Sequence, residues 1–169
     1  SKSTIALNRV VGDGRSIIDG SLSAKGHVFV INPNGVLFGK NSSVDVGGLV
    51  ASTANVTDDD MRNFAQGKGD LGLQIAAGRE ASVINAGTIK AEGGLVTLHA
   101  TNVENTGTIA NEGGQTVLTA AKNLSLAADT AGKLNFTVSG SLANAKALNS
   151  GTLRNDGGYL VMTAKSAGD

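Results

Sequence analysis

The sequence predicts an all-β protein, a right-handed parallel β-helix whose coils contain about 20 residues each. The first observation is an internal repeat, because the segment that begins at Val83 recurs twenty residues later at Val103. The aligned residues are Asn85 with Asn105, Gly87 with Gly107, Thr88 with Thr108, Ile89 with Ile109, and Gly93-Gly94 with Gly113-Gly114. The second observation is alternation of apolar residues within each copy, which is typical of a strand with one buried face. The third is composition: aromatic residues make up 3% of the chain and Gly reaches 24, which suits a narrow core of small side chains.

A third copy of the repeat begins near Ala147 and contains Asn149, Gly151 and Thr152 in the same register. The inward positions of the three copies are Val96, Leu98 and Ala100, then Thr116, Leu118 and Ala120, then Leu160, Met162 and Ala164. Two strands of about five residues cannot bury such a face alone, and the repeat contains no helix to cover it. Stacking the coils in parallel buries each inward residue between its equivalents. A right-handed coil follows from the crossover preference of parallel strands.

Composition excludes several classes of protein. The chain of 169 residues is long enough for one domain with its own core, so we expect a single β-helical domain over residues 1–169. The 14 Lys and Arg balance the 14 Asp and Glu, which leaves no electrostatic signal for nucleic acid. No apolar run approaches about 20 residues, so we expect no membrane insertion. The chain has no cysteine, which excludes disulfides and thiolate zinc sites, and we expect neither a cofactor nor a metal.

The N-terminal third is organised around residues 27–53, which contain the only proline of the chain. Asn32, Pro33, Asn34 and Gly35 lie between two apolar runs, residues 28–31 and 36–38. Asn at the first position, Pro at the second and Gly at the fourth favour a type I β-turn. The sequence therefore predicts a strand, a fixed corner and a second strand. Weaker relatives of the coil unit occur at residues 19–32 and 44–51.

Residues 54–80 alone break the repeat and predict short elements outside the β-helix. Thr57 precedes three aspartates, a pattern that indicates a helix N-cap with an acidic first turn. We expect the helix to lie on the outside of the stack, held there by Phe64. A loop over residues 66–70 then leads to a strand near residues 71–76.

The repeated asparagines Asn85, Asn105 and Asn149 lie beside a glycine at one corner of each coil. Their side-chain amides can hydrogen-bond to the local backbone and form the turn, or to one another as a stacked ladder. The sequence leaves both alternatives open. The Gly-Gly pairs mark a second corner, where we expect positive φ angles.

Residues 121–146 separate the second and third copies. The apolar residues of this segment fall at strand positions and are Leu124, Leu126, Leu134, Phe136 and Val138. We expect this segment to add one further coil of about 24 residues.

Catalytic chemistry has little support in the sequence. His27 and His99 are the only histidines, and His99 aligns with Thr119 and Thr163 on an outward strand position. We therefore expect His99 to be a surface residue, and we expect the protein not to be an enzyme.

Polysaccharide lyases and hydrolases also use β-helices, so a carbohydrate-active enzyme is one alternative. Such sites need acids clustered on one face of adjacent coils. The acids that repeat with the coil are Glu92, Glu112 and Asp156. They flank the Gly-Gly corner, which indicates a solvated corner rather than an active site.

The N-terminal third also resembles a known family. The residues that carry the resemblance are Asn8-Arg9-Val10, Asp19-Gly20, the run from Val28 to Gly35, Gly39, and the run from Gly47-Gly48 to Thr53. They are similar to the N-terminal secretion domain of filamentous haemagglutinin-type exoproteins, which use the two-partner (type Vb) route of Gram-negative bacteria. The match is dense over residues 5–56 and continues more loosely to the end of the chain.

The resemblance implies a right-handed β-helix with extra-helical elements that serves as the secretion signal of a large adhesin-like exoprotein. It implies recognition, in an unfolded or partly folded state, by the periplasmic POTRA domains of a cognate outer-membrane β-barrel transporter. The domain would fold outside the cell, seed folding of the shaft behind it, and belong to a secreted or cell-surface protein with a host or bacterial surface receptor. The secretion motif carries over to Asn32, Pro33, Asn34 and Gly35, and the possible supporting positions are Asn8, Arg9, Gly47 and Gly48.

Two departures from the family pattern bear on the expected boundaries. The chain opens almost directly on Ile5, without the cap that closes the first coil in the family, so we expect a domain truncated at the N-terminal cap and at the C-terminal shaft. The cysteine pair of haemolysin-type members is absent, which favours the adhesin branch. Besides the enzyme, the remaining alternative is a structural piece of an adhesive shaft that binds a surface ligand itself. A purely structural turn is the alternative for residues 32–35.

Overall fold

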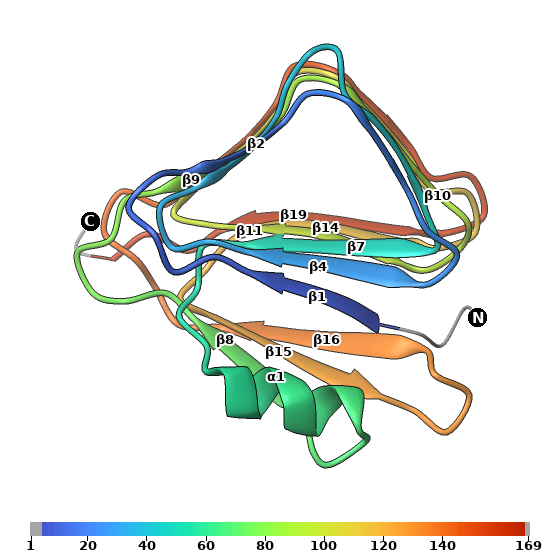
Figure 1. The fold of residues 1–169 in the computed structure, drawn as a ribbon. Helices are drawn as coiled ribbons and strands as arrows, with labels where there is room; N and C mark the ends of the chain where they lie inside the picture. Colours follow the sequence, from blue (N-terminus) through green and yellow to red (C-terminus); the bar gives the residue numbers. More distant parts are fainter. Residues whose placement is uncertain (1–4, 168–169) are drawn as a thin grey trace.

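The computed structural model describes residues 5–167 and consists of stacked coils with three faces (Figure 1). One coil is one turn of the chain through all three faces. The wide face is a six-stranded parallel sheet of β1 (Ile5–Arg9), β4 (His27–Ile31), β7 (Gly48–Ser52), β11 (Leu95–His99), β14 (Gln115–Ala120) and β19 (Tyr159–Ala164). The second face contains β2 (Ser16–Ile18), β5 (Val36–Phe38), β9 (Ser82–Asn85), β12 (Asn102–Asn105) and β17 (Lys146–Asn149). The third face contains β3 (Ser21–Ser23), β6 (Ser43–Val46), β10 (Thr88–Ala91), β13 (Thr108–Ala110) and β18 (Thr152–Arg154).

The parallel β-helix that the sequence predicts is confirmed, and the repeat alignment is the strand register. Leu98 of β11 pairs with Leu118 of β14, which pairs with Met162 of β19. Ile89 pairs with Val44 on one side and with Ile109 on the other. The buried inward residues form one core along the axis, and they include Val30, Phe38, Val44, Leu49, Val83, Ile89, Leu98, Val103, Ile109 and Leu118. Each coil inside the stack therefore buries its apolar residues between those of its neighbours, whereas Leu160 and Met162 on the terminal strand β19 stay exposed.

An outer layer covers the outward side of the wide face (Figure 1). It consists of the helix α1 (Asp58–Ala65) and a three-stranded antiparallel sheet in the order β16 (Leu134–Ser139), β15 (Asn123–Ala128), β8 (Leu71–Gln74). Leu71, Leu124 and Leu126 of this sheet belong to a second buried cluster with outward residues of the wide face. Those outward residues are Phe29, Ile31, Val50, Leu95 and Val117.

The helix predicted within residues 54–80 is confirmed. Thr57 is its N-cap, and the Thr57 hydroxyl accepts a hydrogen bond from the Asp60 amide at 3.0 Å. Phe64 is 3% exposed and its ring centroid lies 6.1 Å from that of Phe29 on β4. The helix is therefore held on the outside of the stack by an aromatic contact, as expected.

The prediction for residues 121–146 is wrong. This segment does not add a coil to the β-helix, because β15 and β16 leave the stack and form an antiparallel hairpin in the outer layer. A period of two specifies a strand with one buried face, but it does not specify whether its partner is parallel or antiparallel. Over residues 5–167, the chain thus leaves the β-helix twice, once between β7 and β9 and once between β14 and β17.

Glycine is required at the corner between the third and wide faces for two reasons. Gly93, Gly113 and Gly157 have φ angles of +84°, +75° and +70°, which β-carbon-bearing residues rarely adopt. The glycine that follows has another role: a β-carbon on Gly94 would lie 2.2 Å from the Gly47 carbonyl oxygen of the adjacent coil. The acidic residues Glu92, Glu112 and Asp156 beside this corner are exposed, as the sequence predicts for a solvated corner.

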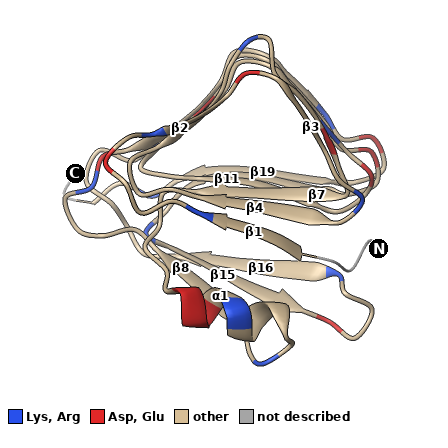
Figure 2. Ribbon diagram, viewed as in Figure 1, with Lys and Arg blue, Asp and Glu red and all other residues tan. Residues whose placement is uncertain are grey.

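Charged residues lie mainly at the corners and in the outer layer, and the strands of the wide face carry few of them (Figure 2). Among residues 5–167, no helix is long and apolar enough to cross a membrane.

Candidate functional site

The corner at Asn32–Gly35 joins β4 on the wide face to β5 on the second face. The Gly35 amide donates to the Asn32 carbonyl oxygen at 3.0 Å, which closes a β-turn. The Asn32 side chain adds a second closure, because its Oδ1 accepts from the Asn34 amide at 2.9 Å. Gly35 has a φ angle of +123°, so glycine is required where the turn ends.

Asn32 is fully buried and ties this turn to the preceding coil. Its Nδ2 donates to the Gly14 carbonyl oxygen at 2.9 Å and to the Ser16 hydroxyl at 3.0 Å. Asn32 is 0% exposed. In the folded domain this residue therefore holds two coils together and offers no surface to a partner.

Asn34 lies at the surface of the same corner and connects three segments of the chain. Its Nδ2 donates to the Gly12 carbonyl oxygen, and its Oδ1 accepts from Arg79 Nη1 at 3.2 Å. Pro33 and Asn34 are half-buried, so part of each remains accessible. Arg79 lies 45 positions along the chain from Asn34, and the sequence pattern did not identify it.

Of the four supporting positions, the structure brings one into this corner. Arg9 ends β1, and its guanidinium donates to the Val56 carbonyl oxygen at 2.6 Å and to Asp58 of α1 at 3.1 Å. Asn8 is exposed on β1. Gly47 and Gly48 lie at the opposite end of the wide face, where Gly48 pairs with His27. A β-carbon on Gly48 would lie 2.3 Å from the His27 ring, so this glycine makes room for the imidazole.

Two clefts flank the Asn34–Arg79 contact. An inner cleft of about 290 Å³ lies toward the wide face, and an outer cleft of about 740 Å³ lies toward the second face. Both are lined by Asp13, Asn34 and Arg79. Arg9, Pro33 and Asn55 also line the inner cleft. Arg15, Glu80 and the turn at residues 76–78 complete the outer one. The contact between Asn34 and Arg79 is therefore a ridge between two concave surfaces.

The predicted asparagine column lies inside the β-helix, away from this corner. Asn85 Nδ2 donates to Asn105 Oδ1 at 2.8 Å, and Asn105 Nδ2 donates to Asn149 Oδ1 at 2.9 Å. Asn85 and Asn105 are fully buried. A second pair, Asn111 and Asn155, forms analogous backbone contacts at the Gly-Gly corner, where Asn111 Nδ2 donates to the Gly94 carbonyl oxygen at 2.9 Å and Asn155 Nδ2 to that of Gly114 at 2.9 Å. These amides are structural.

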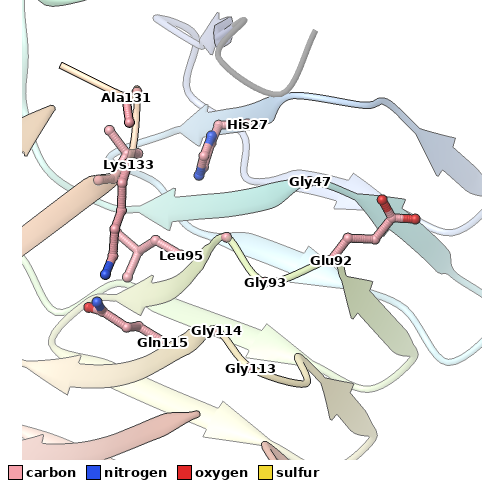
Figure 3. Close-up of a pocket in the computed structure, with 13 residues that line it drawn as sticks. His27, Gly47, Glu92, Gly93, Leu95, Gly113, Gly114, Gln115, Ala131 and Lys133 are labelled. Carbon is pink, nitrogen blue, oxygen red and sulfur yellow. The ribbon is translucent and has the colours of Figure 1, made fainter. Parts of the chain in front are cut away.

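A cavity of about 400 Å³ lies between the Gly-Gly corner and the tip of the β15–β16 hairpin (Figure 3). The His27 ring points into it, Lys133 reaches over it toward Leu95 and Gln115, and the Glu92 carboxylate points away (Figure 3). Within residues 5–167, no three His, Cys, Asp or Glu side chains are placed to hold a metal ion. The cavity thus brings together one ammonium and one imidazole.

The prediction that His99 is a surface residue is wrong. Its outward direction on β11 is as expected, but the outer layer covers it and leaves it 0% exposed. Nδ1 lies 2.8 Å from the Ser52 hydroxyl, and Nε2 lies 2.8 Å from the Ala121 carbonyl oxygen. Because a carbonyl can only accept, Nε2 carries the proton. Burial lowers the pKa of His99 to about 4, against the smaller opposite effect of the hydrogen bond to Ala121.

Stacked parallel coils, an outer layer over one face and a strand–turn–strand corner define a parallel β-helical domain. The structure superposes on the crystal structure of the HMW1 secretion domain from Haemophilus influenzae with a TM-score of 0.81 and 28% sequence identity, over 95% of this chain and 42% of that one. The family model for the TPS secretion domain matches residues 1–169. The chain belongs to this family of secretion domains, which occurs in exoproteins secreted by Gram-negative bacteria and is not a family of enzymes.

Two relatives are heme/hemopexin-binding proteins of Haemophilus influenzae. One is 42% identical over 52 residues, which is 31% of this chain and 6% of that protein. The other, from strain KW20, is 34% identical over 93 residues, which is 53% of this chain and 10% of that protein. The chain thus spans a tenth or less of the length of either relative.

Proposed function

We propose that this domain is the secretion signal of a large adhesin-like exoprotein and that the POTRA domains of its outer-membrane transporter recognise the corner at Asn32–Gly35. The observation that carries the proposal is the match to the TPS secretion domain over the whole chain. The exoprotein is released from the cell or held on its surface, where its remaining length meets a receptor.

The contacts of the motif divide its residues into two roles. Asn32 and Gly35 are required by the fold, because one is buried between coils and the other has a positive φ angle. Pro33 and Asn34 keep accessible surface at the edge of two clefts. We assign recognition, in a partly folded state in which this corner has formed, to Pro33 and Asn34, and the shape of the corner to Asn32 and Gly35.

The proposed export step uses the folding energy of the stack. Each coil adds to an existing end, and covering an inward Val or Leu contributes about 1.5–3 kcal/mol. A chain that folds coil by coil outside the membrane cannot slide back while folded. This domain, as the first to emerge, nucleates the coils that follow.

The Asn34→Ala substitution tests the recognition role. The side chain of Asn34 contacts other residues only at the surface, so we expect the free energy of unfolding to fall by about 1 kcal/mol and the domain to stay folded. Secretion of the full-length exoprotein should fall at least about tenfold, a loss of about 1.4 kcal/mol in recognition. The measurement is exoprotein in the medium by immunoblot, with circular dichroism of the purified domain.

Asn41→Ala is the matched control, because Asn41 is an exposed asparagine on the same coil. Its secretion should equal that of the wild type. Normal secretion of the Asn34→Ala protein would show that the transporter does not recognise the motif. Unfolding of that variant would show that the motif has a structural role only.

A further inference from the structure

We propose that Asn34 is a deamidation site, reactive in the unfolded chain and protected in the folded domain, where neighbouring segments hold both reacting groups. Asn34-Gly35 is the only Asn-Gly step in the sequence. Asparagine is a thermolabile residue, and a glycine after it has no β-carbon to hinder ring closure. Asn32, by contrast, precedes a proline, which has no backbone N–H to react.

The reaction consumes water and releases ammonia. The Gly35 amide nitrogen gives its proton to water or hydroxide and attacks Asn34 Cγ. An N–C bond forms, and the side-chain nitrogen takes up a proton and leaves as ammonia. The cyclic succinimide is then opened by water at either of its carbonyl groups. One opening gives aspartate, and the other gives isoaspartate, in which the main chain runs through the former side chain.

The folded corner withholds the attacking nitrogen. The Gly35 amide donates to the Asn32 carbonyl oxygen at 3.0 Å, and the Gly35 carbonyl oxygen accepts from the Ser16 amide at 3.0 Å. Gly35 is buried, and a β-carbon on it would lie 3.1 Å from the Ser82 carbonyl oxygen. Water or hydroxide therefore reaches the Gly35 N–H only when this corner opens.

The folded domain also holds the group under attack. Asn34 Nδ2 donates to the Gly12 carbonyl oxygen, and Asn34 Oδ1 accepts from Arg79 Nη1 at 3.2 Å. Attack makes the planar Cγ tetrahedral, which moves both atoms away from these partners. Gly12 belongs to the preceding coil, and Arg79 follows the excursion of the chain between β7 and β9. Neither contact exists until these segments have folded.

Neither product fits the corner as asparagine does. In aspartate, an oxygen that can only accept replaces the donor that faces the Gly12 carbonyl oxygen. Isoaspartate lengthens the main chain within the turn, so the hydrogen bond between Gly35 and Asn32 no longer closes it. A chain that reacts before it folds therefore forms a less stable corner. The consequence for export, that a chain kept waiting for its transporter loses this corner, rests on the proposed function, whereas the chemistry does not.

The test follows deamidation of the purified chain in native buffer and in urea, by mass spectrometry of the peptide that contains Asn34. The reaction in native buffer should be at least about tenfold slower, which corresponds to about 1.4 kcal/mol for opening of the corner. Arg79→Ala removes the donor to Asn34 Oδ1. This variant should react several-fold faster than the wild type in native buffer and at the same rate in urea.

The Arg79→Ala chain keeps the contacts of the Arg79 backbone, which donates to the Ala76 carbonyl oxygen and accepts from the Thr101 hydroxyl. Arg62→Ala is the matched control, because Arg62 is exposed on α1 and its ion pair is to Asp59. It should react as the wild type does in both solvents.

A second measurement tests the effect of the products on folding. The chain that has reacted in urea is returned to native buffer and digested briefly with a protease, which spares the folded fraction. The spared fraction should contain less isoaspartate than the digested fraction.

Three results would each overturn this inference: equal wild-type rates in native buffer and urea, equal native rates for the wild type and Arg79→Ala, or equal isoaspartate in the two fractions. None of them affects the proposed function, which fails if the Asn34→Ala exoprotein is secreted normally.

Discussion

Buried asparagine amides fix the stacking of coils at the corner between the second and third faces. Asn85 Oδ1 accepts from the Gly87 amide at 3.2 Å, and Asn85 Nδ2 donates to Asn105 at 2.8 Å. The Asn85 side chain therefore closes the local turn through Oδ1 and joins the ladder through Nδ2. The two alternatives that the sequence left open are both present, because an amide carries an acceptor and donors on opposite sides.

His99 shows what a single buried side chain contributes to the pH dependence of stability. We expect the contribution of His99 to the free energy of unfolding to be constant above pH 6.5 and to fall as the pH is lowered toward 4. The sign follows from the lowered pKa of about 4: between pH 4 and 6.5 the unfolded chain binds a proton that the folded chain excludes. The full loss is about 3 kcal/mol, from 1.36 kcal/mol per pKa unit.

The measurement is urea unfolding at several pH values for the wild type and for His99→Gln. Other groups titrate in both proteins, so the difference between the two curves isolates His99. We expect the variant to be less stable at pH 7 and to lose part of the decline between pH 6.5 and 4. Parallel curves for the two proteins would contradict the assignment.

Local turn chemistry explains why the corner at Asn32–Gly35 was predictable from the sequence, while the contact between Asn34 and Arg79 was not. Asn, Pro and Gly at fixed offsets specify the turn at residues 32–35 without reference to the rest of the chain. Arg79 reaches Asn34 only because the chain leaves the stack after β7 and returns before β9. That detour does not repeat with the coil, so no spacing in the sequence indicates where it ends.

At the scale of elements, the outer layer depends on apolar residues on both sides of the wide face. Strand β4 is buried at all five positions, and so are β7 and β11. A strand in which apolar and polar residues alternate buries only one face. Burial at every position therefore indicates a layer on each side of the strand. This signal was present in Val28–Ile31, but it does not say which segment supplies the cover. The sequence therefore predicts a further coil for residues 121–146, where the structure has the β15–β16 hairpin of the outer layer.

Phe64→Ala tests whether the outer layer is part of the cooperative fold. Phe64 is nearly fully buried and packs against Phe29 of the β-helix. We expect a loss of about 3–5 kcal/mol in the free energy of unfolding, as is typical of buried Phe→Ala changes, with a single unfolding transition retained.

Asn63→Ala is the control, because Asn63 is exposed on the same helix. It should change the stability by less than about 0.5 kcal/mol. Two separate transitions in the Phe64→Ala protein, or in the wild type, would show that the outer layer folds independently of the coils.

At the scale of the whole molecule, stability is a sum over neighbouring coils. Each strand of the β-helix pairs only with the equivalent strands of the coils before and after it. The coil alignment predicts this well, since Leu98 and Leu118 align in sequence and pair directly in space. A coil that cannot bury its inward residues interrupts the stack at that point. Export driven by folding must then stop or slow at the same coil.

Changing both Leu98 and Leu118 to Asp places two unpaired carboxylates at fully buried, adjacent positions of the core. We expect secretion of the full-length exoprotein to fall several-fold or more, with chain accumulating in the periplasm. Leu98→Met with Leu118→Met conserves the volume and should be secreted normally. The amounts in the medium and the periplasm are compared by immunoblot. Because the corner at Asn32–Gly35 lies in an earlier coil, transporter recognition stays available in the Asp variant. Its normal secretion would therefore remove folding as the driving force while leaving recognition in place.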